Sequence, residues 1–412
     1  MKSNPLLELE RFGQSIWLDF IGRGFVASGA LARLIDNDGL SGVTSNPTIF
    51  EKAIDGSDDY DAAIAALAAA GRSAGQIYEA LTIEDIQKAA DLFLPTYRRT
   101  AGADGFVSLE VSPRLARNVA GAIAEARGFW GRVNRPNVMI KIPATEEGLP
   151  VIRELIAEGM NINVTLLFGL ARYRAVVDAY ISGLEDRADR GLPLDRIASV
   201  ASFFLSRIDV LLDPQLDDRV ALGGADAAIA AELRGEAAIA SAKIARQICL
   251  RLFDSPRFAR LAAMGARRQR LLWASTSTKN PHYADVKYVE ALIGPETVNT
   301  LPIETIDAYR DHGRPAPRLE ADAAAAYAVV RKLHGLGVRL DKVAGELVEQ
   351  GVEKFNQSFD KLLTTLERKR RDALAVPDER WGRGRRNRRK SPPRLSGLPA
   401  AARFSSIGGV QA

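Results

Sequence analysis

The sequence predicts an α/β protein, a (β/α)8 TIM barrel with additional helices. Short apolar runs, about eight in number, recur along the chain, and most are followed by a longer helical pattern, which is the alternation of a parallel sheet. The runs at 138–142 and 161–168 are nearly continuous in apolar residues, as expected of strands buried on both faces. The 412 residues, 47% of them hydrophobic, also exceed the roughly 250 of a plain barrel.

The predicted elements follow one another in a regular order. An amphipathic helix opens the chain at about 5–14, and two helical insertions, 58–70 and 83–100, separate the second and third strands. An Ala-rich helical stretch covers 223–253. Two or more helices over 319–371 could pack across the barrel. The strands are expected at 16–20, 42–45, 105–111, 138–142, 161–168, 197–204, 270–275 and 297–302.

Charge divides the chain into two parts, a domain over 1–375 and a tail over 376–412. Residues 377–412 carry nine Lys and Arg against two acidic residues, so the net charge of +5 becomes −2 without them. The tail is also rich in Pro, Gly and Ser, and we interpret it as disordered. The predicted barrel is therefore close to neutral.

Several classes of protein and site are excluded by composition. The longest apolar stretches, such as 62–70, fall well short of the ~18 residues of a membrane span, and no apolar signal segment opens the chain, so we expect a cytoplasmic protein. The single cysteine, Cys249, excludes an internal disulfide, and no histidine pairs at metal-ligand spacing. We expect no metal, no cofactor, no membrane and no nucleic-acid partner, with a monomer or a homodimer both compatible.

Polar residues interrupt or end nearly every apolar run. In TIM barrels the chemistry lies at the carboxyl ends of the strands, so these side chains should face one cavity. An ordinary core would not contain them. They are Asp19, Asn46, Glu110, Lys141, Asn163, Thr165, Ser202 and Ser275.

Lys141, flanked by Ile140 and Ile142, is the most informative of these residues. Lysine is almost never buried unless it is paired or functional. Apolar surroundings favour the neutral amine, which can attack a carbonyl, so a Schiff-base lysine is one interpretation. A structural ion pair with Glu110 or Asp19 is the other, and the spacing alone gives the two equal weight or allows a mixture of both.

Glu110 and Asp19 place two carboxylates on nearby strands, facing the same cavity as the lysine. Imine chemistry needs one group that moves protons during dehydration and another that takes the proton of the hydroxyl whose carbon–carbon bond breaks. A buried salt-bridge network is the structural alternative. The smaller polar residues are individually compatible with hydrogen-bonded core positions, and their joint placement at strand ends favours a site.

Six segments of the sequence resemble those of transaldolases, and they occur in the same order along the chain, over approximately residues 5–370. No single segment is specific, but the lysine, Asn-x-Thr-Leu-Leu-Phe and Thr-Ser-Asn-Pro segments together are. The six are Trp17-Leu18-Asp19, Thr44-Ser45-Asn46-Pro47-Thr48, Ser108-Leu109-Glu110-Val111, Ile140-Lys141-Ile142-Pro143-Ala144-Thr145, Asn163-Val164-Thr165-Leu166-Leu167-Phe168 and Ser202-Phe203-Phe204-Leu205-Ser206-Arg207.

The resemblance implies a metal-free aldol mechanism of class I in the pentose phosphate pathway. A dihydroxyacetone unit would pass from sedoheptulose 7-phosphate to glyceraldehyde 3-phosphate, giving erythrose 4-phosphate and fructose 6-phosphate. Lys141 would form the imine, Asp19 would be the acid/base for bond cleavage, and Glu110 would shuttle protons with a water held by Thr165. By the same matching, the dihydroxyacetone hydroxyls would be bound by Asn46 and Asn163, with Ser202 lining the pocket.

The phosphate end of the substrate is expected near Arg207, which stands at the family's phosphate-binding arginine position. Better-known members place a serine and then an arginine where this chain has Ser275 to Lys279. Here Lys279 could provide the second charge, with Ser275 and Ser277 as hydroxyl or backbone donors. A solvated loop lysine is the alternative.

Two other functions compete with this prediction. The first is a fructose 6-phosphate aldolase activity that uses the same lysine, although such relatives are much shorter and carry a tyrosine where this chain has Glu110. The second is a non-catalytic barrel whose basic tail binds nucleic acid by electrostatics. Some family members continue into a glucose 6-phosphate isomerase domain, and we hypothesise that the tail is the remnant of a truncated fusion.

Overall fold

Eight parallel strands close into one barrel in the computed structural model, which describes residues 4–375. The strands pair in chain order, and β8 pairs with β1 to complete the ring. All eight predicted strands are confirmed, whereas the predicted tail lies outside the described residues. The strands are β1 (Gln14–Leu18), β2 (Gly42–Val43), β3 (Phe106–Glu110), β4 (Val138–Pro143), β5 (Ile162–Leu167), β6 (Ser199–Phe204), β7 (Arg270–Ala274) and β8 (Thr297–Leu301).

Helices cover the outside of the barrel, and both predicted insertions are themselves helical. Between β2 and β3 lie α4 (Pro47–Asp55), α5 (Asp61–Ala69) and α6 (Ala74–Arg99), and the Ala-rich stretch forms α11 (Ala227–Leu233) and α12 (Ala237–Phe253). The remaining helices are α1 (Pro5–Arg11), α2 (Arg23–Ala27), α3 (Ala30–Asp38), η1 (Pro113–Leu115), α7 (Val119–Val133), α8 (Gly148–Glu158), α9 (Leu170–Asp189), α10 (Ser206–Leu222), α13 (Pro256–Ala262), α14 (Lys287–Ala291), α15 (Ile303–His312), α16 (Ala323–Gly335) and α17 (Leu340–Ala375).

The first helix is shorter than predicted. It ends at Arg11, because Gly13, with a φ of 73°, turns the chain, and Gln14 already belongs to β1. The buried Gln14 side chain donates to the Leu292 carbonyl and to Thr297 Oγ1, on or beside β8. Closure of the barrel, which needs β1 to pair with β8 from Gln14 onward, therefore overrides the helical pattern.

A layer of large apolar side chains fills the barrel interior below the strand ends. Trp17, Phe106, Met139 and Leu272 belong to one buried cluster that gathers side chains from strands all around the ring. Gly42 leaves room for the indole of Trp17, because a Cβ at this position would lie 2.5 Å from that ring. Since side chains on one strand alternate between faces, the residues two positions further along each strand also point inward, above this layer.

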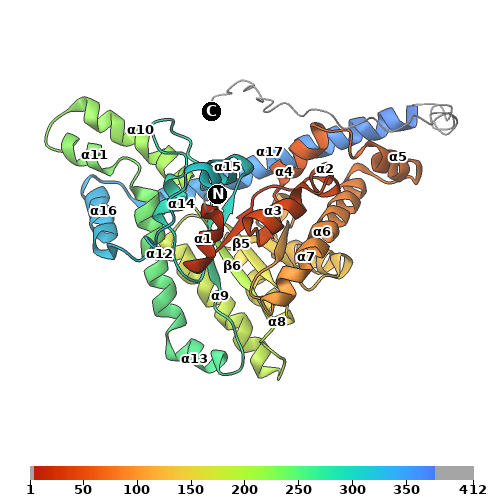
Figure 1. Cartoon of the computed structure of the whole chain (residues 1–412), viewed down its shortest axis with the longest axis horizontal. Helices are drawn as coiled ribbons and strands as arrows, with labels where there is room; N and C mark the ends of the chain where they lie inside the picture. Colours follow the sequence, from red (N-terminus) through yellow and green to blue (C-terminus); the bar gives the residue numbers. More distant parts are fainter. Residues whose placement is uncertain (1–3, 376–412) are drawn as a thin grey trace.

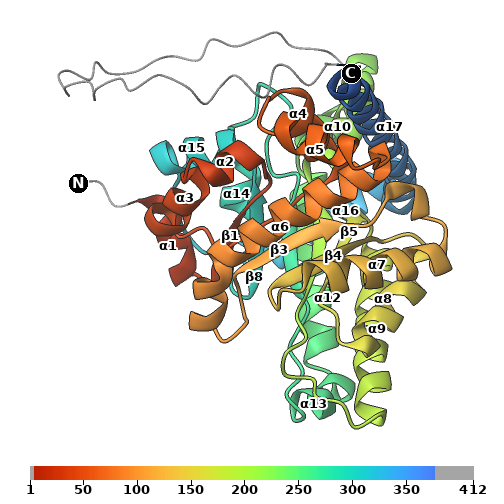
Figure 2. The ribbon, with the colours of Figure 1, turned by 90° about the vertical axis from the view of Figure 1, so that its right-hand side faces the viewer.

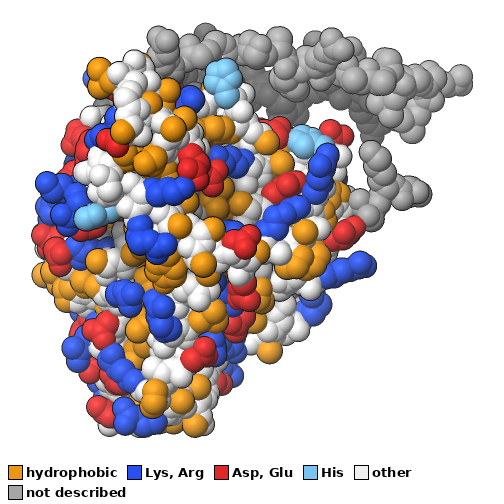
Figure 3. Space-filling view, turned by 90° about the vertical axis from the view of Figure 1, so that its left-hand side faces the viewer, with side chains coloured by type: hydrophobic (Ala, Val, Ile, Leu, Met, Phe, Trp, Pro, Cys, Tyr) orange, Lys and Arg blue, Asp and Glu red, His pale blue; other side chains and the backbone are white. Residues whose placement is uncertain are grey.

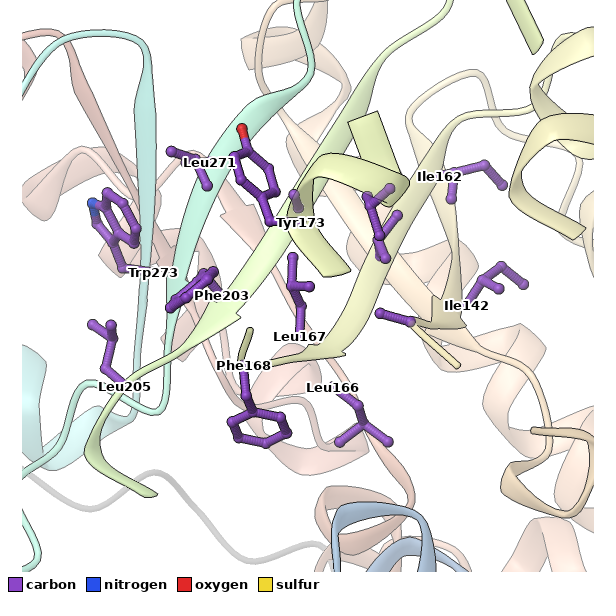
Figure 4. Packing of buried hydrophobic residues seen from close by; sticks show 14 of the residues in the cluster. Ile142, Ile162, Leu166, Leu167, Phe168, Tyr173, Phe203, Leu205, Leu271 and Trp273 are labelled. Carbon is purple, nitrogen blue, oxygen red and sulfur yellow. The ribbon is translucent and has the colours of Figure 1, made fainter. Parts of the chain in front are cut away.

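The two predicted C-terminal helices are α16 and α17, and α17 packs across the barrel as expected (Figure 1). It runs beside α4 and α5, and it reaches the end of β5, where Leu166 adopts a φ of 53° at a register irregularity. Leu166 points away from the neighbouring core residues and toward a segment of α17 (Figure 4). A Cβ added to Gly351 of α17 would lie 2.8 Å from Leu166 Cδ2, so helix and strand end are in close contact. Figure 2 shows the same helix alongside α4 and α5 from the side.

The surface agrees with a nearly neutral domain. On the face drawn in Figure 3, Lys and Arg side chains are interspersed with Asp and Glu. Among residues 4–375, no helix is both long and apolar enough to cross a membrane.

Candidate active site

Glu110, Lys141 and Asn163 lie side by side on β3, β4 and β5. The strand register pairs Glu110 with Lys141 and Lys141 with Asn163, so the three share one level of the barrel. Met139, two residues before Lys141, belongs to the interior layer, which places Lys141 inside the barrel as well. All three residues are buried. The structure thus brings together the predicted nucleophile, one predicted acid/base and one predicted amide.

The amine of Lys141 makes both an ion pair and a hydrogen bond. Its Nζ lies 3.3 Å from Glu110 Oε2 and donates to the Ser45 carbonyl at 3.0 Å. Lys141 is 4% exposed and Glu110 6%, so the pair is shielded from water. The ion-pair interpretation is therefore part of the geometry, and the strand register places the Lys141 amine at the same level of the barrel as Glu110 and Asn163.

Glu110 is a carboxyl group poised to hold a proton. Burial raises its pKa, and the neighbouring charge of Lys141 opposes that shift. Among the described residues, neither Glu110 Oε2 nor the buried Thr165 Oγ1 has a hydrogen-bond partner. Buried polar atoms normally have partners, so both atoms can accept or donate to a molecule that enters the cavity.

Asp19 lies directly after β1 and is held by a chain of hydroxyl groups. Thr44 Oγ1 donates to Asp19 Oδ1 at 2.7 Å and lies 2.8 Å from Thr300 Oγ1. A hydroxyl has a single hydrogen, and that of Thr44 goes to Asp19, so Thr300 must donate to Thr44. Burial raises the pKa of Asp19, while the charge of Lys141 and the Thr44 hydrogen bond oppose the shift.

The two predicted amide residues are oriented by their neighbours. Asn46 is the N-cap of α4, where its Oδ1 accepts from the Ile49 backbone N–H, so its amide hydrogens stay free to donate. Asn163 Nδ2 donates to Ser108 Oγ, and its Oδ1 accepts from Ser202 Oγ at 2.7 Å. Ser202 therefore fixes the orientation of the Asn163 amide, a role that differs from simply lining the pocket.

The predicted phosphate-binding residues gather around the start of α10. Half-buried Arg207 stands in the first turn of this helix, which has no side-chain cap, and burial lowers the pKa of its guanidinium. Ser275, with a φ of 54°, places its hydroxyl 2.9 Å from that of Ser206. The backbone N–H groups of Leu205, Ser206 and Ile208 already donate to protein carbonyls, so it is the guanidinium of Arg207 that favours an anion here.

Lys279 lies in the same neighbourhood. Its Nζ donates to Ser277 Oγ at 2.8 Å. Loss of hydration lowers the pKa of Lys279, Glu304 opposes this, and the charge of Arg207 adds to it. The two cations are thus close enough to repel each other.

Sequence reasoning missed two groups of residues. Thr44 and Thr300 support Asp19, and alternation along β8 from Val298 would have pointed to Thr300 as an inward residue. The charges of Arg207 and of Lys52 on α4 both lower the pKa of Lys354 on α17, and no local pattern identified Lys52 or Lys354.

A cavity of about 510 Å³ lies beside the site and not over Lys141. Its walls come mainly from the loop after β4, the start of α9 and the first turns of α17, and none of the predicted catalytic side chains lines it. A smaller cavity, about 230 Å³, adjoins Lys279 and the acidic face of α10. Within residues 4–375, no group of three or more His, Cys, Asp or Glu is arranged to hold a metal ion.

Comparison with known proteins gives a consistent result. Residues 16–366 match the family model described as Transaldolase/Fructose-6-phosphate aldolase. A protein of Nostoc sp. named Transaldolase 2 is 48% identical over 374 residues, which cover 90% of this chain and 98% of that protein. A protein named Transaldolase from Thiobacillus denitrificans is 48% identical, over 88% of this chain and 99% of that protein. Another of the same name, from Saccharopolyspora erythraea, is 47% identical, over 89% of this chain and 98% of that protein.

Proposed function

Because this chain belongs to the transaldolase/fructose-6-phosphate aldolase family, we propose that it is a transaldolase acting through a Schiff base on Lys141. The reaction moves a dihydroxyacetone unit from sedoheptulose 7-phosphate to glyceraldehyde 3-phosphate, giving erythrose 4-phosphate and fructose 6-phosphate. The observation that carries the assignment of the nucleophile is the buried amine of Lys141, 3.3 Å from the Glu110 carboxylate.

The Lys141–Glu110 pair provides the proton that imine formation requires. Transfer of a proton from the ammonium to Glu110 leaves a neutral amine, which attacks the ketone carbon of the sugar to give a carbinolamine. Glu110 then returns the proton to the carbinolamine hydroxyl, which leaves as water. Because burial raises the pKa of Glu110, the protonated intermediate state of this carboxyl is less costly than it would be in solvent.

Asp19 is suited to the second proton transfer. Its carboxylate takes the proton from the hydroxyl on C4, the C3–C4 bond breaks, the aldehyde leaves, and the three-carbon enamine stays on Lys141. Addition of the acceptor aldehyde reverses these steps, and Asp19 returns the proton to the new hydroxyl. The hydrogen bond from Thr44 keeps Asp19 oriented as a carboxylate. Thr165, whose buried Oγ1 has no hydrogen-bond partner among the described residues, and Glu110, which is paired with Lys141, would hold the water that moves protons during dehydration.

The remaining residues would bind the substrate. Free amide hydrogens of Asn46 and the Ser202-oriented amide of Asn163 suit the hydroxyls of the dihydroxyacetone unit. Arg207, with Lys279 and the hydroxyls of Ser275 and Ser277, suits the phosphate. A cytoplasmic location and the absence of a nucleic-acid partner stay predictions.

Borohydride trapping tests the nucleophile directly. Incubation with fructose 6-phosphate and borohydride should reduce the imine to a stable adduct, and peptide mass spectrometry should locate it on Lys141. An adduct on another lysine, or none, would contradict the proposal.

A fructose 6-phosphate aldolase activity is the second candidate, because the family model covers both activities. It would release free dihydroxyacetone from fructose 6-phosphate without an acceptor. The relatives described above are all named transaldolases, and Glu110 occupies the proton-shuttle position. We therefore expect turnover to depend on an aldehyde acceptor.

We also propose that residues 1–375 hold the entire catalytic unit. The matching segments of the relatives cover 98% or 99% of those proteins and only 88–90% of this chain. A variant that ends after Ala375 should therefore keep full turnover. Loss of activity in a folded truncated protein would show that the tail takes part in the reaction.

A further inference from the structure

The middle of α17 passes over the barrel mouth between two loops of the proposed site. Gly351 contacts Leu166, which directly follows Thr165. Two turns later, Ser358 Oγ lies 2.8 Å from Thr48 Oγ1, at the start of α4. The segment between these contacts is therefore held above the carboxyl ends of the strands.

Lys354 lies on the face of α17 that these contacts define. Gly351, Lys354 and Ser358 stand at positions i, i+3 and i+7, which share one side of a helix. Gly351 contacts Leu166 at the end of β5, and Ser358 contacts Thr48 at the start of α4. The Cα–Cβ bond of Lys354 therefore leaves α17 on the side that faces these two segments. On α4, Lys52 is one turn beyond Thr48. Because Thr48 meets Ser358 and Glu51 meets Lys361, the two helices run in the same direction, so Lys52 starts further along the interface than Lys354.

Lys354 differs from the other basic residues along this interface. Lys361 pairs with Glu51 at 2.5 Å, and Lys369 pairs with Asp61 at 2.7 Å. Lys354 has no carboxylate partner among the described residues. Its side chain is exposed, and the charge of Arg207 lowers its pKa, with partial loss of hydration and the charges of Lys279 and Lys52 adding to the effect.

These four cations stand on segments that meet at this end of the barrel, because α17 packs against both α4 and α10. They come from α4, the first turn of α10, the loop after β7 and α17. Two carboxylates are near, since Glu304 and Asp19 both act on Lys279, but they leave the region positive. Like charges held together raise the free energy of the folded protein unless an anion neutralises them. A phosphate dianion fits this charge.

We propose that Lys354 of α17 and Lys52 of α4 bind the phosphate of the sugar together with Arg207 and Lys279. The C-terminal helix is then part of the active site, and Lys354 determines the preference for phosphorylated substrates. This inference rests on the proposed function, because it assigns the far end of the same bound sugar.

Kinetics with two acceptors test the role of Lys354. In a double-displacement reaction, kcat/KM for the acceptor reports only its addition to the enamine, so the donor can stay sedoheptulose 7-phosphate throughout, with erythrose 4-phosphate as the released aldehyde. For Lys354→Met, kcat/KM for glyceraldehyde 3-phosphate should fall about tenfold, as for the loss of one charge-assisted contact, while that for glyceraldehyde stays unchanged. Lys354→Arg should recover most of the loss.

Two further measurements make the test specific. Inorganic phosphate should inhibit the unmodified enzyme competitively, and its inhibition constant should rise about tenfold in Lys354→Met. Lys342→Met, which changes an exposed lysine in the first turn of the same helix, is the matched control and should alter neither value. Lys52→Met should resemble Lys354→Met with a smaller effect.

The possible results separate this inference from the proposed function. If the unmodified enzyme gives no borohydride adduct with fructose 6-phosphate, the proposed function fails. If the adduct forms but Lys354→Met changes both acceptors equally or neither, the role of Lys354 is refuted and the function stands. Thermal unfolding of each variant identifies any that lose activity through loss of the fold, and Lys354→Arg then serves as the test.

Discussion

The hydroxyl chain behind Asp19 makes a quantitative prediction about the pH dependence of turnover. Thr44→Val removes the hydroxyl that donates to Asp19 Oδ1 at 2.7 Å and keeps the shape of the side chain nearly unchanged. A hydrogen bond donated to a carboxylate stabilises the ionised form, so its loss raises the pKa of Asp19 further above its ordinary value. Burial already raises this pKa in the unmodified protein.

The size of the effect follows from the strength of the lost contact. A hydrogen bond to a charged group contributes about 1.5–3 kcal/mol, and 1.36 kcal/mol corresponds to one pH unit. In the proposed reaction, bond cleavage needs Asp19 as the carboxylate. The acid limb of the pH profile of kcat/KM should therefore move to higher pH by about one to two units. Thr300→Val, which removes the donor to Thr44, should cause a smaller shift in the same direction.

The assay is kcat/KM for fructose 6-phosphate with an acceptor, measured from acid to neutral pH for both variants. Thr44→Ser keeps the hydroxyl and is the control, with an expected profile close to that of the unmodified enzyme. An unchanged acid limb in a folded Thr44→Val protein would refute the reasoning, as would a shift of equal size in Thr44→Ser.

Three other predictions concern the barrel interior. Lys141→Met should abolish turnover and borohydride trapping and leave a cooperative unfolding transition, whereas failure to fold would favour a purely structural ion pair. Glu110→Gln should lower the free energy of unfolding by about 3 kcal/mol, because it leaves a buried ammonium unpaired. The double variant Glu110→Gln with Lys141→Met should regain most of this lost free energy, as measured by denaturant titration. Gly42→Ala should cost about 1–3 kcal/mol, because its Cβ would meet the Trp17 ring, while Gly128→Ala, with no atom within 4 Å, should be neutral or stabilising by up to about 1 kcal/mol. An equal effect of the two glycine substitutions would contradict that packing argument.

Much of the site could be anticipated because strand residues alternate between two faces. Asp19, Glu110 and Lys141 interrupt apolar runs, and a polar residue in such a run is visible without any knowledge of its neighbours. The strand register then sets Glu110 beside Lys141, which sequence could offer only as one of several pairings. The role of Ser202 as the partner of Asn163 depended on the side-chain geometry across β5 and β6.

The errors and omissions have equally specific causes. The first helix was extended to Gln14 because its apolar period continues past Gly13, and only pairing with β8 shows that Gln14 is in a strand. Lys52 and Lys354 were overlooked because each sits in an ordinary charged helix surface. The two lysines can be recognised as a pair only from the packing of α17 against α4.

By itself, the sequence indicated the eight strands and the inward polar residues at their ends, since local periodicity encodes these features. Periodicity left Lys141 equally suited to a Schiff base and to an ion pair, and the family resemblance favours the Schiff base. Tertiary structure alone decided which of those residues touch. Thr44 and Thr300 are 256 residues apart and meet only because the barrel closes. Lys354 approaches Arg207 only because α17 crosses the strand ends. Contacts between distant segments depend on the path of the whole chain, and no local pattern records them.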